Sequence, residues 1–214
     1  MAKVLGTIVD AHKGFTCTIR EDDAKRVYFT ADADIDADGA NGQNNKPVAY
    51  KKDNSGTEAL GNGDMKIQNG KVVFKEGWGR DVVIVGSDNQ PKIFPGGIIA
   101  SMTWYVYPGK NLDDPTAYVN SEVVPYIVVP PLIIHKTQGV VRGCKARVTW
   151  QGSTVDCVVA DKGPGNLVGE LSIAAARALG IPNLSPRNGG IDDPELLYEL
   201  WPGVAAPGFV LQPA

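Results

Sequence analysis

The sequence predicts a mainly β protein, and three observations support this. First, 25 glycines and 15 prolines interrupt the 214-residue chain at short intervals. Second, the runs between them are short and rich in β-branched residues. Third, only two segments carry helix signals. Many short strands separated by turn residues are typical of a barrel or a sandwich. We expect one domain over residues 1–214, because a chain of this length can bury one substantial core.

The expected strands share valine, isoleucine, threonine and aromatic residues. They are Lys3–Val9, Phe15–Ile19, Arg26–Thr30, Lys71–Phe74, Asp81–Val85, Ile98–Tyr107, Pro125–Val129, Val140–Trp150 and Thr154–Ala160. The last two form a predicted hairpin over Gln151-Gly152. Cys144 and Cys157 would then lie almost opposite each other, either as a disulfide or as two buried thiols. Cys17 is left over, and we expect it to be buried.

Two short helices are predicted near the C-terminus. Ser172 can cap a helix over Ile173–Leu179, which Gly180 can end. Asp193 can cap a second helix over Pro194–Trp201, because proline suits the first helical position.

Composition excludes several classes of function. The net charge of −3 and the pI near 5.4 argue against nucleic-acid binding. No apolar run reaches the ~20 residues that span a bilayer, so no membrane contact is expected. The chain has no CxxC and no GxSxG motif, and it contains two histidines. Of these, His135 lies in an apolar stretch and is expected in the core or at a strand end. We therefore expect no metal, no cofactor, and chemistry carried out by carboxylates.

Asp161 and Glu170 are the candidate catalytic pair. A predicted strand ends at Asp161, a glycine- and proline-rich loop follows, and Glu170 precedes the capped helix. Both carboxylates then lie at the rim of a sheet and can face one groove. Glycosidic cleavage needs a proton donor and a second group that handles water or the sugar cation. Alternatively, Asp161 starts an Asx turn and Glu170 stabilises a helix N-terminus.

A second acidic segment contains Asp32, Asp34, Asp36 and Asp38. Alternate residues of an extended segment share one face, so these carboxylates could bind a polycation. The spacing also matches the start of an EF-hand calcium loop, but the twelfth position is Asn45 rather than glutamate. A solvated turn is the third interpretation. We favour substrate recognition, with Asp36 central.

These motifs resemble those of a known family. The pattern around Asp161 and Glu170, V-x-D-K-G-P followed by E-L-S-x-A-A-A-R-A-L-G, resembles the second half of double-psi β-barrels of the expansin type. More specifically, Asp161 and the segment Gly169-Glu170-Leu-Ser-Ile-Ala resemble the catalytic stretch of the glycoside hydrolase family 75 chitosanases. The segment from Asp34 to Gly39 resembles the family's Asp-x-Asp-x-Asp-Gly motif. The segment Val124–Pro130 resembles its Pro-Tyr-x-Val segment, and the three matches follow the family's order.

The resemblance implies a six-stranded double-psi β-barrel with a large insertion. It implies a chitosanase that cleaves β-1,4-glucosaminide bonds internally and with inversion, with Asp161 and Glu170 as catalytic residues. We assign Glu170 as the general acid and Asp161 as the base or an orienting group. Asp34 or Asp36 is expected to position the attacking water. The residues expected to bind substrate are Asp34, Asp36, Asp38, Tyr126 and Lys162.

The partner is then chitosan or its oligosaccharides, whose ammonium groups suit the acidic row. We expect a secreted monomer, although the segment Met1-Ala-Lys-Val-Leu is not followed by a signal-peptide apolar region. A peptidoglycan-lytic barrel enzyme and a non-catalytic, expansin-like polysaccharide-binding protein are the alternatives. Trp78, Trp104 and Tyr107 could stack on sugars in each case, or could lie in the core.

Overall fold

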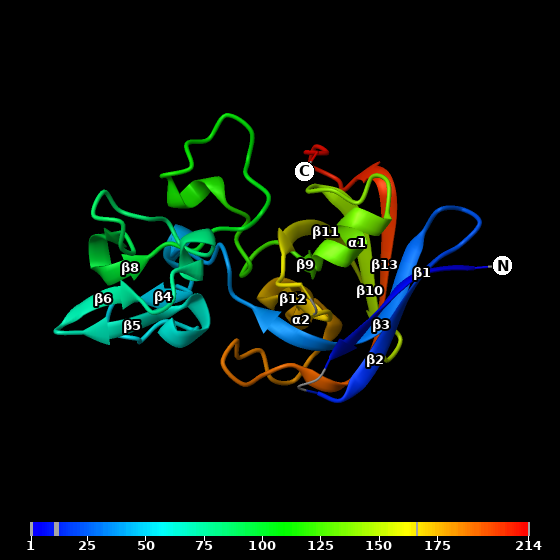
Figure 1. Cartoon of the computed structure of the whole chain (residues 1–214), viewed down its shortest axis with the longest axis horizontal. Coiled ribbons are helices and arrows are strands. Elements are labelled where there is room, and N and C mark those ends of the chain that lie inside the picture. Colours follow the sequence, from blue (N-terminus) through cyan, green and yellow to red (C-terminus); the bar gives the residue numbers. More distant parts are fainter. Residues whose placement is uncertain (1, 11–12, 166, 214) are drawn as a thin grey trace.

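The computed structural model describes residues 2–10, 13–165 and 167–213. Its centre is a closed, six-stranded mixed β-barrel (Figure 1). In spatial order, the barrel strands are β3 (Val27–Asp36), β12 (Glu170–Ser172), β9 (Tyr126–Val129), β11 (Ser153–Lys162), β10 (Cys144–Trp150) and β13 (Ile191–Ala205), which returns to β3. The pairs β3–β12 and β9–β11 are parallel, and the other four are antiparallel. The prediction of a mainly β barrel is confirmed.

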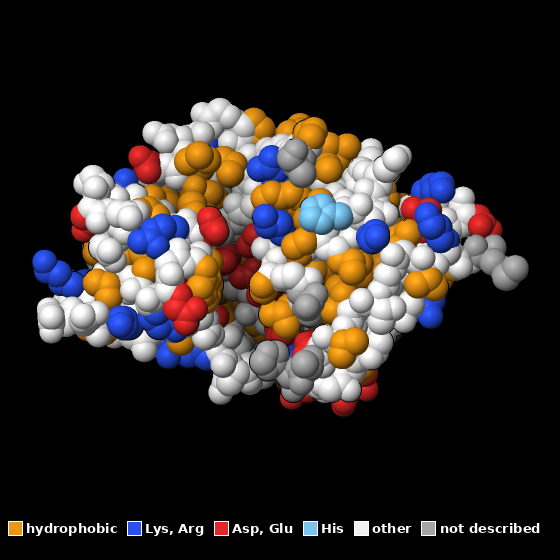
Figure 2. Space-filling view, in the orientation of Figure 1, with side chains coloured by type: hydrophobic (Ala, Val, Ile, Leu, Met, Phe, Trp, Pro, Cys, Tyr) orange, Lys and Arg blue, Asp and Glu red, His pale blue; other side chains and the backbone are white. Residues whose placement is uncertain are grey.

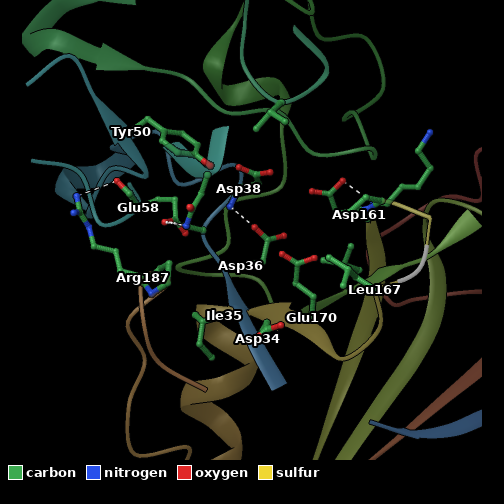
Figure 3. Close-up of a pocket in the computed structure, with 18 of the residues that line it drawn as sticks. Asp34, Ile35, Asp36, Asp38, Tyr50, Glu58, Asp161, Leu167, Glu170 and Arg187 are labelled. Carbon is green, nitrogen blue, oxygen red and sulfur yellow. Dashed lines mark hydrogen bonds between the residues drawn. The ribbon is translucent and has the colours of Figure 1, made fainter. Parts of the chain in front are cut away.

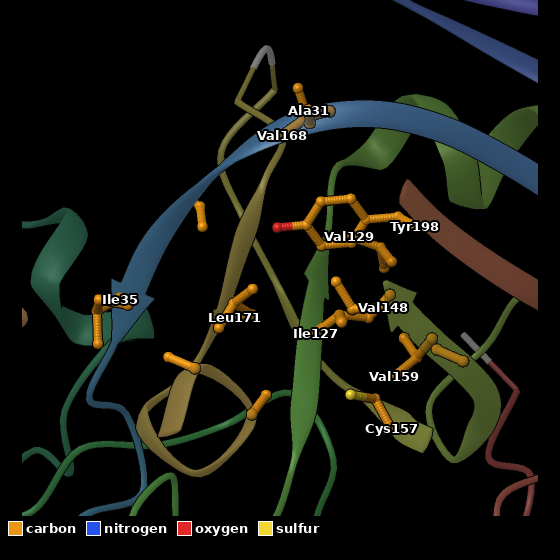
Figure 4. Packing of buried hydrophobic residues seen from close by; sticks show 14 of the residues in the cluster. Ala31, Ile35, Ile127, Val129, Val148, Cys157, Val159, Val168, Leu171 and Tyr198 are labelled. Carbon is orange, nitrogen blue, oxygen red and sulfur yellow. The ribbon is translucent and has the colours of Figure 1, made fainter. Parts of the chain in front are cut away.

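Apolar side chains from all six strands fill the barrel (Figure 4). Ile127, Leu171 and Leu196 are fully buried. Tyr198 is also buried. Its hydroxyl is satisfied there, because it lies within hydrogen-bond distance of the carbonyl oxygens of Asp32 and Gly169, at 2.8 and 2.9 Å. A buried tyrosine with satisfied hydrogen bonds ties β13 to the strands that carry the acidic residues.

The predicted hairpin is confirmed, with β10 and β11 joined over Gln151-Gly152. Both turn residues have positive φ, as tight two-residue hairpin turns require. Cys157 pairs with Ala146, so it lies two positions away from the partner of Cys144. All three cysteines are free and buried, which confirms the burial of Cys17 and excludes the disulfide in this structure.

The helix α2 (Ile173–Leu179) is confirmed, with Ser172 Oγ accepting a hydrogen bond from Ala175 N at 3.1 Å. The predicted helix over Pro194–Trp201 is wrong, because this segment belongs to β13. Leu196, Tyr198 and Leu200 alternate into the core, and β13 closes the barrel by pairing with both β10 and β3. Pro194 is tolerated because it falls in the irregular stretch of the β3 pairing, between Ile191 and Leu196.

The second α-helix of the described chain is instead α1 (Pro131–Lys136), with Pro131 at its start. His135 is exposed at the last turn of α1, so its expected place in the core or at a strand end is wrong. No helix among the described residues combines the length and the apolarity needed to cross a lipid bilayer.

Strands β1 (Lys3–Asp10) and β2 (Phe15–Glu21) form a hairpin that extends from β3. Between β3 and β9, residues 41–118 form two small sheets of their own, and we call this segment the lobe (Figure 1). Its strands are β4 (Tyr50–Lys51), β5 (Met65–Gln68), β6 (Lys71–Phe74), β7 (Ile93–Phe94) and β8 (Ile98–Ile99). Its 3-10 turns are η1 (Gln43–Asn45), η2 (Leu60–Gly63), η3 (Trp78–Asp81), η4 (Pro95–Gly97) and η5 (Pro115–Ala117). The strands predicted over Asp81–Val85 and Ile98–Tyr107 are therefore largely turns and isolated bridges.

Candidate active site

A cleft of about 630 Å³ separates the barrel from the lobe, and its floor is acidic (Figure 2). Among the described residues, eight acidic side chains line it, against two basic ones. The acidic residues are Asp34, Asp36, Asp38, Glu58, Asp81, Asp161, Glu170 and Asp192, and the basic residues are Lys162 and Arg187. Such an excess of carboxylates in a concave site attracts a cationic ligand.

Four of these carboxylates form the floor of the cleft, and barrel strands position three of them. Asp36 ends β3, Asp161 lies one residue before the end of β11, and Glu170 begins β12. Asp38 follows two residues after β3. Since β3 and β12 run parallel with Glu170 opposite Asp34, Glu170 and Asp36 lie on adjacent strands two positions apart. Their side chains point toward one another in Figure 3.

The backbone places Glu170 by close packing. Gly169 has φ +89°, and a Cβ there would lie 2.0 Å from Oδ1 of the buried Asp32. Glycine is therefore required directly before Glu170, in a left-handed conformation that other residues rarely adopt. The carboxylate of Glu170 in turn lies near Gly163, whose added Cβ would be 3.7 Å from Oε2. The loop from 161 to 170 thus leaves space for this side chain.

Hydrogen bonds distinguish the members of this group. Asp36 accepts from Asp38 N at 2.7 Å and from the Tyr126 hydroxyl at 2.9 Å. Asp161 Oδ1 accepts from Trp104 N at 3.0 Å and from Lys162 N at 2.7 Å. Within the part of the chain that the structure describes, the carboxylates of Glu170 and Asp38 accept no hydrogen bond.

Burial and mutual repulsion control protonation in the cleft. Burial raises the pKa of Glu170 well above its usual value, and the charges of Asp36 and Asp161 raise it further. Burial and the charge of Asp36 also raise the pKa of Asp161 well above its usual value, although its two backbone hydrogen bonds oppose this. Burial raises the pKa of Asp36 only to about 6, because its two hydrogen bonds favour the ionised form. Its two hydrogen bonds thus favour the ionised form of Asp36, whereas burial and the neighbouring charges favour the protonated form of Glu170.

Carboxylate oxygens of Asp36, Asp38 and Asp161 all lie within 4.8 Å of one another, close enough to hold a cation. An all-oxygen set of this kind suits Ca²⁺ or Mg²⁺ rather than zinc. Asp34 is not part of this group, and Asp161 comes from a different strand. The arrangement is therefore not that of the EF-hand loop suggested by the spacing of the aspartates.

The remaining predicted residues occupy different positions. Lys162 is exposed and lines the cleft, and Asp34 lines it while accepting a hydrogen bond from Lys13 Nζ at 2.6 Å. Lys13 also pairs with the buried Asp32. Tyr126 is fully buried beneath Asp36 and does not line the cleft. Its hydrogen bond to Asp36 gives it a positioning role, rather than the substrate contact that the sequence predicts.

Several residues of the cleft were not predicted from the sequence, or were left open by it, and Glu58, Arg187 and Trp78 are the most informative. Glu58 is buried in the lobe, and burial raises its pKa to about 7. Arg187 extends from the segment after α2 and donates to the carbonyl oxygens of Asn54, Gly56 and Glu58 at 2.7–3.1 Å, which connects the barrel to the lobe. Trp78 lines the lobe side. No local pattern identifies Glu58 or Arg187, because their roles depend on contacts between distant segments.

Comparison with known proteins gives no further assignment: no protein-family model and no curated protein matches the chain. The candidate function therefore depends on the motifs and on the geometry of the cleft.

Proposed function

We propose that this protein is an endo-acting glycoside hydrolase that cleaves the β-1,4-glucosaminide bonds of chitosan. One observation carries the proposal: Glu170 and Asp36 point toward one another at the floor of an acidic cleft, one with a pKa well above its usual value and the other with a pKa of about 6. A pair of carboxyl groups with different protonation states is what glycosidic hydrolysis requires.

In the proposed reaction, Glu170 donates its proton to the oxygen of the leaving sugar as the C1–O bond breaks. Water attacks C1 from the opposite side and transfers a proton to the ionised carboxylate of Asp36. Each turnover leaves Glu170 ionised and Asp36 protonated, and proton exchange with solvent restores both. Asp161 lies beside this pair, and two backbone N–H groups hold its carboxyl group in place, so it acts as an orienting group.

The charge of the cleft supports a cationic glycan as substrate. Each deacetylated unit of chitosan carries an ammonium group, and the cleft offers eight carboxylates against two cations. A neutral polymer such as cellulose or chitin has no charge to match this excess, and peptidoglycan adds acidic groups that the cleft would repel. The acidic cleft thus favours chitosan over the substrates of the alternative functions.

The resemblance to the family 75 chitosanases agrees with this proposal. We propose further that the barrel is of the double-psi type, with the lobe as the large insertion between its first and last parts. A polymeric substrate of this kind also suits a secreted enzyme. Because one fold hosts many functions, the fold alone carries no weight for the chemistry.

The decisive experiment is to incubate the protein with chitosan, chitin, cellulose and peptidoglycan in parallel and to measure new reducing ends. The matched control is Glu170→Gln, purified in the same way, which exposes any contaminating hydrolase. We expect reducing ends from chitosan alone, and a lower rate as salt screens the carboxylates. Equal turnover of chitosan and chitin, or no turnover of any polymer, would contradict the proposal.

A further inference from the structure

Trp78 is a large apolar side chain left half exposed in a cleft. It begins η3 on the lobe side, and 49% of its surface is exposed. Tyr107 and Trp104, by contrast, are partly buried and pack against core clusters. An exposed tryptophan that lines a concave site offers a flat apolar face to a ligand.

The turn that presents Trp78 is firmly anchored. The carboxylate of Asp64, which is fully buried, accepts hydrogen bonds from the backbone N–H groups of Glu76, Gly77 and Gly79 at 2.9, 2.6 and 3.1 Å. The exposure of Trp78 is therefore a property of a built turn rather than of a loose loop. A preorganised ring loses little conformational entropy when a ligand stacks on it.

A buried carboxylate belongs to the same wall. Glu58 is 7% exposed. Two hydrogen bonds from the described residues reach its side chain, from Ala59 N at 2.6 Å and from Asn62 Nδ2 at 2.8 Å, and Oε1 accepts both. Its Oε2 accepts none from them. Glu58 nevertheless lines the cleft, and Oε2 is the carboxylate oxygen that the described residues leave without a hydrogen bond.

Close packing connects Glu58 with Trp78. Asn62 lies in η2, and η2 contacts η3 so closely that a Cβ on Gly79 would lie 2.4 Å from the carbonyl oxygen of Gly63. The indole ring is therefore carried by a turn that packs on η2, and Asn62 of η2 holds the carboxylate of Glu58. Both face the cleft from the side opposite the barrel strands.

We infer that Trp78 and Glu58 form a binding subsite for one 2-amino sugar unit, with the apolar face of the pyranose ring on the indole and the ammonium group near Glu58 Oε2. Asp64 is a positioning residue that holds the turn. The chemistry is complementary, because a glucosamine ring combines an apolar C–H face with one cation. The identity of the sugar rests on the proposed function, whereas the stacking platform does not.

Binding can be measured without turnover in the Glu170→Gln background. Glucosamine hexamer, N-acetylglucosamine hexamer and cellohexaose are titrated by calorimetry and by quenching of tryptophan fluorescence. We expect Trp78→Ala to weaken binding of the glucosamine hexamer by about 10-fold, and Trp78→Phe to restore most of it. Glu58→Gln should weaken the glucosamine hexamer about 10-fold while leaving cellohexaose unchanged. Asp64→Asn should reduce quenching and affinity together.

The matched control is Ile67→Ala, because Ile67 is 52% exposed on the same lobe and does not line the cleft. Trp78→Ala binding as tightly as Ile67→Ala would overturn the subsite, whatever the enzyme cleaves. Binding that depends on Trp78 and Glu58, without hydrolysis of chitosan by the unaltered protein, would support the subsite and reject the proposed function. Chitosan hydrolysis that is insensitive to Trp78→Ala and Glu58→Gln would support the proposed function and reject the subsite.

Discussion

The hydroxyl of Tyr126 donates a hydrogen bond of 2.9 Å to Oδ2 of Asp36 from beneath the floor of the cleft. This contact favours the ionised form of Asp36 and opposes the effect of burial on its pKa. Since Tyr126 is fully buried, it acts on the reaction through the two groups that accept its hydrogen bonds, the carboxylate of Asp36 and the backbone carbonyl of Asp38 at 3.0 Å. The relationship leads to the first prediction.

Tyr126→Phe should raise the pKa of Asp36 above about 6, because one of its two stabilising hydrogen bonds is lost. If Asp36 is the base, the acid limb of the pH profile for kcat/KM moves to higher pH, and the rate at pH 6 falls by about 10-fold. The rate at the pH optimum should fall less. A profile that keeps its shape while the rate falls uniformly would indicate a purely structural role.

Replacing the catalytic carboxylates tests their roles directly. Glu170→Gln and Asp36→Asn should each reduce kcat by about two to four orders of magnitude, the usual contribution of a positioned acid or base. Asp161→Asn should also reduce kcat, because it replaces one oxygen of the orienting group with an amide nitrogen. Circular dichroism establishes that the variants are folded. A folded variant with a near-normal rate would remove that residue from the mechanism.

The stereochemistry of the first product tests the assignment of Asp36 as base. An inverting enzyme fits a water molecule between its base and the sugar, with its carboxyl groups about 6.5–9.5 Å apart. We therefore expect NMR to detect the α-anomer before mutarotation. A β-anomer, together with a trapped sugar adduct on a carboxylate, would replace this mechanism with a retaining one.

The carboxylate cluster should lower stability at neutral pH. Asp36 has a folded-state pKa of about 6 against about 3.9 when unfolded, so the folded state binds more protons between these values. The free energy of unfolding then falls as pH rises through this window. Hydrogen bonds lower the pKa of Asp64 below its unfolded value. Asp64 therefore stabilises the folded state at higher pH, and this contribution is lost below about pH 4. We expect the Tm to be highest near pH 4, where the effects of these two groups balance.

Neutralising one member of the cluster should raise the Tm at pH 7.5. Asp38→Asn removes a carboxylate whose pKa is raised by burial and by its neighbours, chiefly Asp36. A gain of about 1–2 kcal/mol corresponds to about 2–8 °C for a chain of this size. Asp113→Asn is the control, because Asp113 is exposed and does not line the cleft. An equal Tm for both variants would argue against repulsion in the cleft.

Arg187 should matter for the width of the cleft. Arg187→Ala removes three hydrogen bonds to lobe carbonyls, so the lobe is held less firmly against the barrel. We expect KM for chitosan to rise several-fold and kcat to change little, since Arg187 does not contact the catalytic carboxylates. Arg147→Ala, which breaks a pair with Asp156 outside the cleft, is the control. Identical kinetics for the two variants would contradict the role of Arg187 in holding the lobe against the barrel.

The parts of the protein that the sequence predicted correctly are those with local signals. Gln151-Gly152 marked the hairpin, and Ser172 with Gly180 marked α2. The two motifs around Asp36 and Glu170 identified segments that meet in one cleft because β3 and β12 pair in parallel. In β13, closure of the barrel overrode the helix signals of Asp193 and Pro194, because pairing on both sides outweighs a favourable helix start.

Within the lobe, the strand predicted over Lys71–Phe74 is confirmed as β6, but most of the lobe could not be assigned from sequence for a related reason. Its strands are two to four residues long, too short for a periodic pattern. Glu58 faces the barrel carboxylates across the cleft, and its backbone carbonyl accepts a hydrogen bond from Arg187, which follows it by 129 residues. Such relationships depend on how distant segments pack, and no short motif encodes them.

One side of the cleft belongs to the closed barrel and the other to the lobe, and this division affects how substrate specificity can change. Three of the four carboxylates of the floor are set by strand register, so moving any of these three would disturb the core. The opposing wall is built from one uninterrupted stretch of chain on short turns, where substitutions, insertions and deletions are tolerated more easily. Laboratory evolution toward other polymers should therefore accumulate changes in residues 41–118 while the barrel sequence stays nearly constant.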